Sequence, residues 1–392
     1  MTQAKIIELL SALIGFPSVS RDSNYNIAGY IEAYLEAQGV AVTRVAAPDD
    51  PKVSLLATIG PADRPGVMLS AHMDVVPTDG QSWTTDPFKA DLRENRIYGR
   101  GATDMKGFLA VALAHVPQFR QSAVAAPVHL AFSYDEEVGC RGAPGLASAA
   151  SRLPCPPALC IVGEPTHMKV ARAHKGKIAR RLTFHGRNGH SALPDKAANA
   201  VEAAARVAAA ISALDERLVA DGLKDAAFDP PRSTLHIGSL HGGGALNLVP
   251  DLATLEFELR YLPAEPVARL MADIDAAIAV QDARLKARGA QGIADEEIIA
   301  YPGLDLPPGK AAITALGALA ADPAPGSTVS FGTEAGIFQQ HGIPSLVCGP
   351  GDIARAHKAD EWIALEELAA ASSMMDRLSA RLGTPLKEWM PA

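Results

Sequence analysis

Short apolar runs alternate with stretches of helical periodicity in the first part of the chain. Apolar runs lie at residues 40–45, 53–59, 67–70, 128–134 and 159–162, and a helix is expected from about residue 106 to 116. Strands that are apolar on both sides are typical of parallel or mixed sheets covered by helices on both faces. The same pattern returns at residues 311–320 and 345–349. It predicts an α/β fold with a mixed, largely parallel sheet sandwiched by helices.

The middle of the chain has a different pattern. Residues 253–261 alternate strictly between apolar and polar side chains, and helical stretches are expected at 197–218 and 266–280. A strand with one polar face predicts an antiparallel sheet that carries its helices on the other face. We therefore expect one domain formed by residues 1–172 and 285–392, interrupted by an inserted α+β domain at residues 173–284.

Charge and composition argue against several classes of binding partner. The 392 residues include 36 Lys+Arg and 44 Asp+Glu, which gives a formal net charge of −8. Binders of nucleic acids or anionic membranes usually present a basic face, so we expect neither partner. The sequence contains no apolar run of about 20 residues that would span a membrane. Four cysteines without a Cys-x-x-Cys pair, and an N-terminus unlike a signal peptide, predict a cytoplasmic protein.

Histidine and acidic residues follow the apolar runs, at the points where the predicted strands end. They are His72 and Asp74 after residues 67–70, Glu136 and Glu137 after 128–134, Glu164 after 159–162, and His357 after 345–349. Ligands of open α/β sheets bind beyond the carboxyl ends of the strands, so we expect these side chains at one edge. Carboxylates gathered there would repel one another without a cation. The pattern therefore predicts a metal site.

Two metal ions would account for both histidines, because a dinuclear site takes imidazole and carboxylate ligands around a bridging carboxylate. Asp104 is a candidate bridge, since it lies on a glycine-flanked turn that starts a helix. Successive side chains diverge, so we expect one of Glu136 and Glu137 to bind metal and the other to act as a base. The remaining histidines without acidic companions are expected to be packing or surface residues; they are His115, His129, His185 and His236.

Several motifs, in this order, resemble the aminoacylase/carboxypeptidase family of dinuclear zinc hydrolases. The motifs are HMDVVP at 72–77, YGRGATDMKG at 98–107, DEEVG at 135–139, GEPT at 163–166 and NGHSA at 188–192. Two more, at 331–336 and 348–361, look most like the acetylornithine deacetylase branch of that family. The resemblance implies a zinc-peptidase-like catalytic domain that binds the metals, and an inserted ferredoxin-like domain for dimerisation and closure.

The resemblance also implies a role for each metal-site residue. Two Zn²⁺ ions, which Co²⁺ could replace, would be bound by His72, Asp104 and Glu164 on one side and by Asp104, Glu137 and His357 on the other. Asp74 would orient His72 through its second ring nitrogen. Glu136 would be the general base that takes a proton from the bridging water and passes it to the leaving amine.

Residues outside the metal ligands are assigned by the same resemblance. His190 would donate a hydrogen bond to the oxyanion in the neighbouring site of a homodimer formed through the inserted domain. Asn247 and Arg260 would bind polar groups of the substrate, and a guanidinium suits a bidentate contact with an α-carboxylate. The backbone of Gly332 and Thr333 could contact the same carboxylate.

The activity implied by the resemblance is removal of the acetyl group from N2-acetyl-L-ornithine, a reaction of arginine biosynthesis. N-acetylcitrulline, N-succinyl-diaminopimelate and dipeptides remain alternative substrates, because the metal site defines amide hydrolysis and not the side chain accepted. The small-molecule substrate is an N-acyl amino acid in each case.

Other classes of protein fit less well. Residues 241–244 (HGGG) resemble the oxyanion loop of serine esterases, and 189–193 is close to their nucleophile elbow. The loop follows the serine instead of preceding it, and the final glycine is missing. A nucleotide-binding loop at Gly99 and Gly101 fails because Asp104 stands where the third glycine belongs. A non-catalytic binding protein would have lost Glu136 or a ligand, and all are present.

Overall fold

The computed structural model describes residues 3–391, which divide into two compact units. Unit 1 takes the described residues up to Ala173, then Leu304–Val329 and the chain from Thr333 onward. Unit 2 takes His174–Gly303 and Ser330–Gly332. Within the described part of the chain, no helix combines the length and apolar character needed to cross a lipid bilayer.

The centre of unit 1 is a mixed sheet whose inner strands are parallel. In spatial order its strands are β1 (Val42–Ala46), β2 (Val53–Ile59), β6 (Val128–Ser133), β3 (Val67–His72), β7 (Leu159–Pro165), β17 (Ser345–Gly349), β8 (Ala171–His174) and β15 (Leu304–Asp305), with β16 (Ser327–Val329) beside β8. Strands β6, β3, β7 and β17 run parallel to their neighbours in this group and are buried along their whole length. The predicted largely parallel sheet is therefore confirmed.

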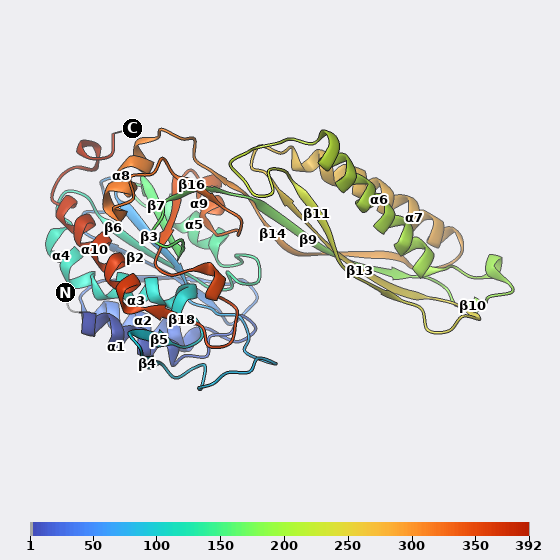
Figure 1. Cartoon of the computed structure of the whole chain (residues 1–392), viewed down its shortest axis with the longest axis horizontal. Helices are drawn as coiled ribbons and strands as arrows, with labels where there is room; N and C mark the ends of the chain where they lie inside the picture. Colours follow the sequence, from blue (N-terminus) through green and yellow to red (C-terminus); the bar gives the residue numbers. More distant parts are fainter. Residues whose placement is uncertain (1–2, 392) are drawn as a thin grey trace. The chain divides into compact units, whose positions relative to one another are not determined.

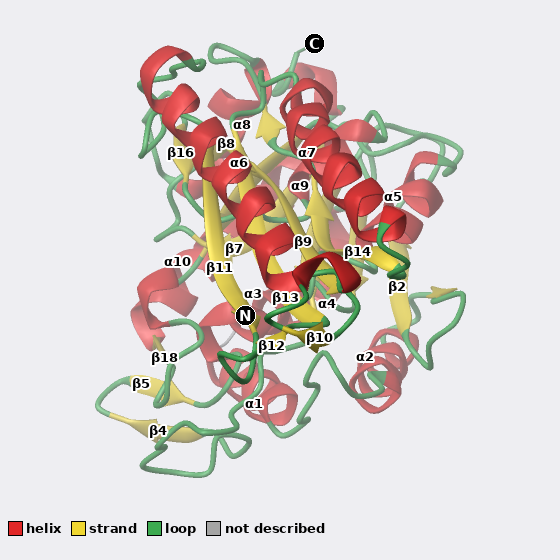
Figure 2. Cartoon of the chain, turned by 90° about the vertical axis from the view of Figure 1, so that its right-hand side faces the viewer, coloured by secondary structure: helices red, strands yellow, loops and turns green. Residues whose placement is uncertain are grey.

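Helices pack on this sheet in layers (Figures 1 and 2). They are α1 (Gln3–Ile14), α2 (Tyr25–Ala37), α3 (Gly107–Ala114), α4 (Val116–Ser122), α5 (Ala143–Ser151), α8 (Ala311–Ala320), α9 (Ala335–Gln340) and α10 (Leu365–Arg381). Helix α3 is buried along its whole length because it packs against α1, α10 and the sheet. Helix α5 packs instead on α9 and β2.

Short elements complete unit 1 near the ends of its strands. They are β4 (Asp91–Arg93), β5 (Arg96–Tyr98) and β18 (Trp362–Ala364), which pair with one another, and the helical turns η1 (Ala102–Lys106), η3 (Ile353–Arg355) and η4 (Leu386–Glu388). The pairing of β18 with β5 joins the C-terminal part of the unit to the segment that precedes η1.

Unit 2 is an antiparallel sheet with its helices on one face (Figure 2). The strand order is β11 (Thr234–Gly242), β13 (Leu252–Tyr261), β9 (Gly176–His185) and β14 (Gly292–Tyr301), and the helices are α6 (Ala200–Asp221) and α7 (Val267–Ala287). The apolar positions of β13 enter a core with both helices, while its polar positions face the other side. Unit 2 also contains a small sheet of β10 (Gly189–His190) and β12 (Leu248–Val249), and the turn η2 (Pro194–Lys196).

The predicted end of the inserted domain, at residue 284, is corrected by the structure. Strand β14 pairs with β9 from Gly292 opposite His185 to Tyr301 opposite Lys177, so unit 2 continues to Gly303. Much of this edge strand is exposed, and its central Asp-Glu-Glu run interrupts the apolar pattern. The alternation that identified β13 is therefore absent from β14.

Strands β7 and β17 approach each other closely at two glycines. A Cβ atom on Gly349 would lie 1.9 Å from the carbonyl oxygen of Gly163, and one on Gly163 would lie 2.0 Å from the ring of Phe108. The Gly163 carbonyl is backbone and the Phe108 ring is fully buried, so neither can move aside and both positions require glycine. The contact holds Glu164, the next residue of β7, at its place along the sheet.

We predict that Gly349→Ala lowers the free energy of unfolding of unit 1 by about 1–3 kcal/mol, the usual range for overpacking a core. Urea unfolding followed by tryptophan fluorescence would measure the change. Gly383→Ala is the matched control, because a Cβ there meets nothing within 4 Å. Equal stability of the two variants would contradict the prediction.

Candidate metal centre

His72 ends strand β3 with one ring nitrogen held and the other available. Its Nδ1 donates to the carbonyl oxygen of Asp74 at 2.9 Å and lies 3.6 Å from the Asp74 carboxylate. This arrangement places the proton on Nδ1. Nε2, the nitrogen that a metal would take, lies 2.9 Å from Asp104 Oδ1 and 3.6 Å from Glu164 Oε1. A neutral imidazole in this tautomer is the form that binds metals.

Asp104 lies between the two histidines. Its Oδ1 is 2.9 Å from His72 Nε2, and its Oδ2 is 3.2 Å from His357 Nε2. His357 Nε2 is also 3.0 Å from Glu137 Oε2. One carboxylate thus presents a separate oxygen to each imidazole, which is the arrangement that a bridging ligand requires.

Glu361 holds the turn that carries Asp104 through hydrogen bonds to the backbone of that turn. Glu361 Oε1 accepts hydrogen bonds from the backbone N–H groups of Thr103 and Asp104 at 2.9 and 3.1 Å, and Oε2 pairs with the Arg100 guanidinium at 2.6 Å. Both charged side chains are 1% exposed. The sequence motifs contain both residues, but a long-range contact of this kind leaves no periodic signal, so no role was predicted for them.

The Asp74 carboxylate organises the turn after β6. It accepts the backbone N–H of Glu136 at 3.1 Å on Oδ1 and that of Glu137 at 3.3 Å on Oδ2, while Ser20 Oγ donates to Oδ2 at 2.7 Å. Asp135 begins this turn with a φ of 53°, in the left-handed region. Asp74 therefore joins the end of β3 to the segment that carries both glutamates.

Glu136 and Glu137 lie in two different groups of possible metal ligands. In the first group, ligand atoms of His72, Glu136 and Glu164 lie within 4.8 Å of one another. In the second group, ligand atoms of His72, Asp104 and Glu137 do so. The two groups share His72, and each takes one of the glutamates, which lie on the turn that follows strand β6 after Ser133. Geometry alone leaves both of them able to bind a metal.

Lys52 and Asp135 form a buried ion pair beside this turn. The two side chains are 6% and 2% exposed, and Lys52 Nζ also donates to the carbonyl oxygen of Ser20. Breaking a buried pair by removing one partner leaves an uncompensated charge, which costs about 3–5 kcal/mol. The pair therefore fixes the start of the glutamate turn relative to Ser20 and Asp74. It was not predicted from the sequence.

The electrostatics of the cluster reflect its burial. Burial raises the pKa of Glu136 and of Glu164 well above the usual range, and it raises the pKa of Glu137 to about 7. Burial also tends to raise the pKa of Asp104, but the His357 and His72 imidazoles within hydrogen-bond distance hold that pKa below the ordinary value. Hydrogen bonds to Asp104 and Glu137 raise the pKa of His357 to about 10. Buried carboxylates this close together repel one another unless positive charge lies among them.

The donor set fits two divalent ions. Nitrogen and oxygen ligands bound tetrahedrally at about 2.0–2.1 Å lie ~3.3 Å apart, close to the separations between these imidazoles and carboxylates. His72, Asp104 and Glu164 could hold one ion, and Asp104, Glu137 and His357 the other. Both sets come from unit 1: Asp104 lies on the turn η1, and the other ligands lie at the carboxyl ends of β3, β6 and β7 and in the loop after β17.

The residues expected to complete the site from the inserted domain lie in unit 2. His190 pairs with Leu248 in the β10–β12 sheet, and the N–H of Ser191 donates to the carbonyl oxygen of Asn247 at 3.1 Å. The structure thus brings the segments of His190 and Asn247 together. His190 is exposed, and its Nδ1 accepts the N–H of Ala192 at 3.1 Å.

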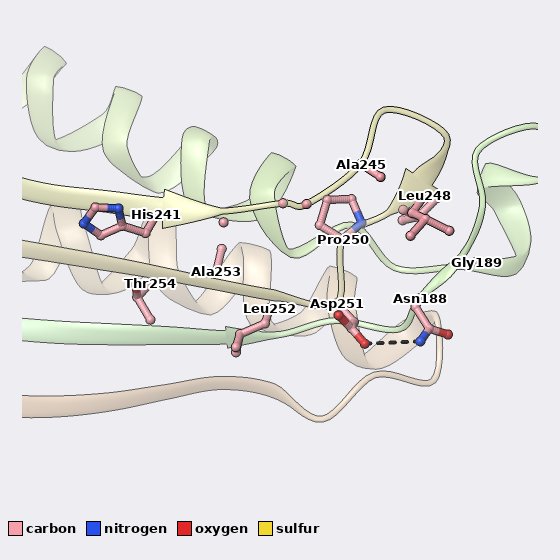
Figure 3. A pocket seen from close by; sticks show the side chains of 14 residues that line it. Asn188, Gly189, His241, Ala245, Leu248, Pro250, Asp251, Leu252, Ala253 and Thr254 are labelled. Atoms are coloured by element: carbon pink, nitrogen blue, oxygen red, sulfur yellow. Dashed lines mark hydrogen bonds between the residues drawn. The ribbon is translucent and has the colours of Figure 1, made fainter.

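A cavity of about 670 Å³ lies beside these two segments (Figure 3). Its lining includes the glycines at 242–244, Ala245, Leu248 and Asn188, whose side chain donates to Asp251 at 3.3 Å. The walls are mainly apolar or backbone, and they lack the convergent acidic and imidazole groups found in unit 1. This cavity therefore differs in chemistry from the metal-site candidate.

The other predicted substrate residues have structural partners. Arg260 Nε pairs with Glu258 at 2.8 Å on the polar face of β13, and Lys177 pairs with the same carboxylate at 2.7 Å. Gly332 has no room for a Cβ, which would lie 2.1 Å from the Tyr301 ring. Thr333 is buried, and its Oγ1 accepts the N–H of Ala335 at the start of α9. A substrate role for these three residues stays a prediction.

Several relatives match this chain in sequence over almost its whole length. An acetylornithine deacetylase of Proteus mirabilis is 32% identical over 380 residues, which cover 95% of each chain. One from Myxococcus xanthus is 32% identical over 387 residues, or 95% of this chain and 96% of the relative. Among solved structures, an M20 family metallo-carboxypeptidase from Sulfolobus solfataricus matches 97% of this chain and 99% of its own, with a TM-score of 0.76 at 17% identity.

A family model extends the same finding. The model described as peptidase family M20/M25/M40 matches residues 68–381, a range that contains every candidate metal ligand. The resemblance seen in the motifs is thereby confirmed. The chain belongs to peptidase family M20/M25/M40 and is a metallohydrolase that acts on amide bonds.

Proposed function

We propose that this protein hydrolyses the acetyl amide of N2-acetyl-L-ornithine to L-ornithine and acetate, with two Zn²⁺ ions that Co²⁺ can replace. The observation that carries the proposal is Asp104, whose two oxygens face His72 and His357 separately. Full-length relatives named acetylornithine deacetylase support the choice of substrate. The reaction would belong to arginine biosynthesis in the cytoplasm.

Metal ions bound there would lower the pKa of water toward about 7 and polarise the substrate carbonyl. The protein's own contribution is to move one proton. Glu136 takes it from the attacking water as the new C–O bond forms, and gives it to the amine nitrogen as the C–N bond breaks. Burial raises the pKa of Glu136, which suits a group that must both accept and release a proton.

Asp74 supports this chemistry without touching the substrate. Its carboxylate and carbonyl hold Nδ1 of His72, and its two oxygens hold the backbone of Glu136 and Glu137. The ligand and the base are therefore placed by one buried group. Loss of this carboxylate would disturb both.

Unit 2 contributes substrate binding and oxyanion stabilisation in this proposal. His190 donates to the oxyanion in the partner subunit of a homodimer formed through unit 2, because the candidate metal ligands all belong to unit 1. Asn247, Arg260 and the backbone of Gly332 in unit 2, together with the backbone of Thr333 in unit 1, bind polar groups of the N-acyl amino acid. Arg260 would exchange its contact with Glu258 for the α-carboxylate of the substrate.

The first prediction concerns the substrate and the metals. Among N-acetyl-L-ornithine, N-acetyl-L-citrulline, N-acetyl-L-methionine and N-succinyl-diaminopimelate, we expect the highest kcat/KM for N-acetyl-L-ornithine. Chelation should abolish this activity, and about two Zn²⁺ or Co²⁺ per chain, counted by mass spectrometry, should restore it. A kcat/KM at least tenfold higher for another of these amides would identify that amide as the substrate instead. Full activity in metal-free protein would contradict the mechanism.

The second prediction separates the base from the ligands. Glu136→Gln should keep both metals but lower kcat by about 10²–10⁴, the usual contribution of general acid–base catalysis. Asp104→Asn is the matched amide control, and it should lose metal because it removes the carboxylate between the two histidines. If Glu136→Gln lost metal as readily as Asp104→Asn, Glu136 would be a ligand and Glu137 the base.

The third prediction concerns His190 and the homodimer. His190→Ala should lower kcat by about 10²–10³ with unchanged metal content, because one oxyanion donor contributes that much. Mixed dimers of His190→Ala and Glu136→Gln should recover up to half of the wild-type activity, since one site combines both intact residues. Subunit exchange is checked with two affinity tags. Exchange without recovery would show that His190 does not act across the dimer.

A further inference from the structure

Cys140 lies against the side chain assigned as the general base. Its Sγ is 3.5 Å from Oε1 of Glu136, within the range for a sulfur hydrogen bond, and its backbone N–H donates to the carbonyl oxygen of Glu136 at 2.9 Å. Cys140 is 1% exposed, so this contact is shielded from solvent. The thiol and the Glu136 carboxyl are thus held together by both backbone and side chain.

The backbone at Cys140 is unfavourable for a residue with a side chain. Its φ is 55°, in the left-handed region that glycine enters readily and that other L-residues enter at a cost of about 1–2 kcal/mol. The preceding residue is Gly139, so a glycine already serves the adjacent turn position. A side chain kept in such a conformation at the edge of an active site points to a functional role for the sulfur.

The surroundings of the thiol contain acceptors. Among the groups that the structure describes around Glu136, the Cys140 thiol is the side chain that donates to its carboxyl. The neighbouring charged groups that act on Cys140 are the carboxyls of Glu136, Glu334 and Glu164. Burial, together with these acids, raises the pKa of the thiol well above its usual range, so it stays protonated and can donate.

We propose that Cys140 is a positioning residue for the general base. Its thiol fixes Oε1 of Glu136, which selects one rotamer of that side chain and leaves Oε2 to carry the proton. A thiol is a weak donor, so it orients the carboxylate without strongly reducing its basicity. This inference rests on the proposed role of Glu136, and it adds a residue that acts through Glu136 and not on the substrate.

Three substitutions test the proposal. Cys140→Ala removes the donor and should lower kcat about tenfold, a size consistent with loss of one hydrogen bond, with KM and metal content unchanged. Cys140→Ser keeps a donor and should return kcat to within about twofold of wild type. Cys140→Gly also removes the donor but suits the left-handed backbone, so a purely structural role predicts normal kcat and our proposal predicts the same loss as in Cys140→Ala.

The matched control is Cys160→Ala, which removes another fully buried thiol of unit 1, in strand β7. We expect it to change stability while kcat stays within about twofold. An equal loss of kcat in Cys140→Ala and Cys160→Ala would overturn the proposal, and so would failure of Cys140→Ser to restore activity. If Cys140→Ala does not fold, Cys140→Gly and Cys140→Ser give the same comparison.

A double-mutant cycle separates this inference from the proposed function. If Cys140 acts through Glu136, Cys140→Ala should not lower the residual rate of Glu136→Gln any further, because the group it positions has lost its function. A further tenfold loss in that background would overturn the role of Cys140 while leaving Glu136 as the base. Full activity of Glu136→Gln itself would instead refute the base assignment of the proposed function.

Discussion

The buried carboxylate of Asp74 is the contact on which the arrangement of the metal centre depends. It lies 3.6 Å from Nδ1 of His72, which donates to the Asp74 carbonyl. It accepts hydrogen bonds from the backbone of Glu136 and Glu137 and from the side chain of Ser20. A single charged group thereby couples the ends of two neighbouring parallel strands. Because it is 1% exposed, each of these hydrogen bonds is formed away from competing water.

Charged groups behind the ligands hold the rest of the site in the same way. Glu361 accepts two backbone N–H groups of the turn that carries Asp104, and Arg100 compensates its charge. The pair of Lys52 and Asp135 does the same for the glutamate turn. Loops at the ends of strands are usually mobile, and these buried contacts give them the fixed geometry that a metal centre needs.

The sequence predicted the parts of this protein that follow local rules. Unbroken apolar runs identified the buried strands, and the alternation of apolar and polar residues identified the polar face of β13. The residues after each apolar run identified candidate ligands. The contact of Arg100 with Glu361 spans 261 positions, and that of Lys52 with Asp135 spans 83, so neither could be inferred from neighbouring residues. Glu136 and Glu137 enter two different groups of possible ligands that share His72, and the choice of Glu136 as the base stays a prediction.

The insertion of unit 2 between β8 and β15 has a consequence for the order of folding. Strand β17 pairs with β7 and brings the segment of His357, yet it is synthesised after the whole of unit 2. Until then β7 is an apolar edge strand, and such edges pair readily with other chains. Unit 2 has its own core and can fold during this interval. The group of candidate ligands that includes His357 is therefore completed late in biosynthesis, so a truncated chain would be prone to aggregate before all the candidate ligands could come together.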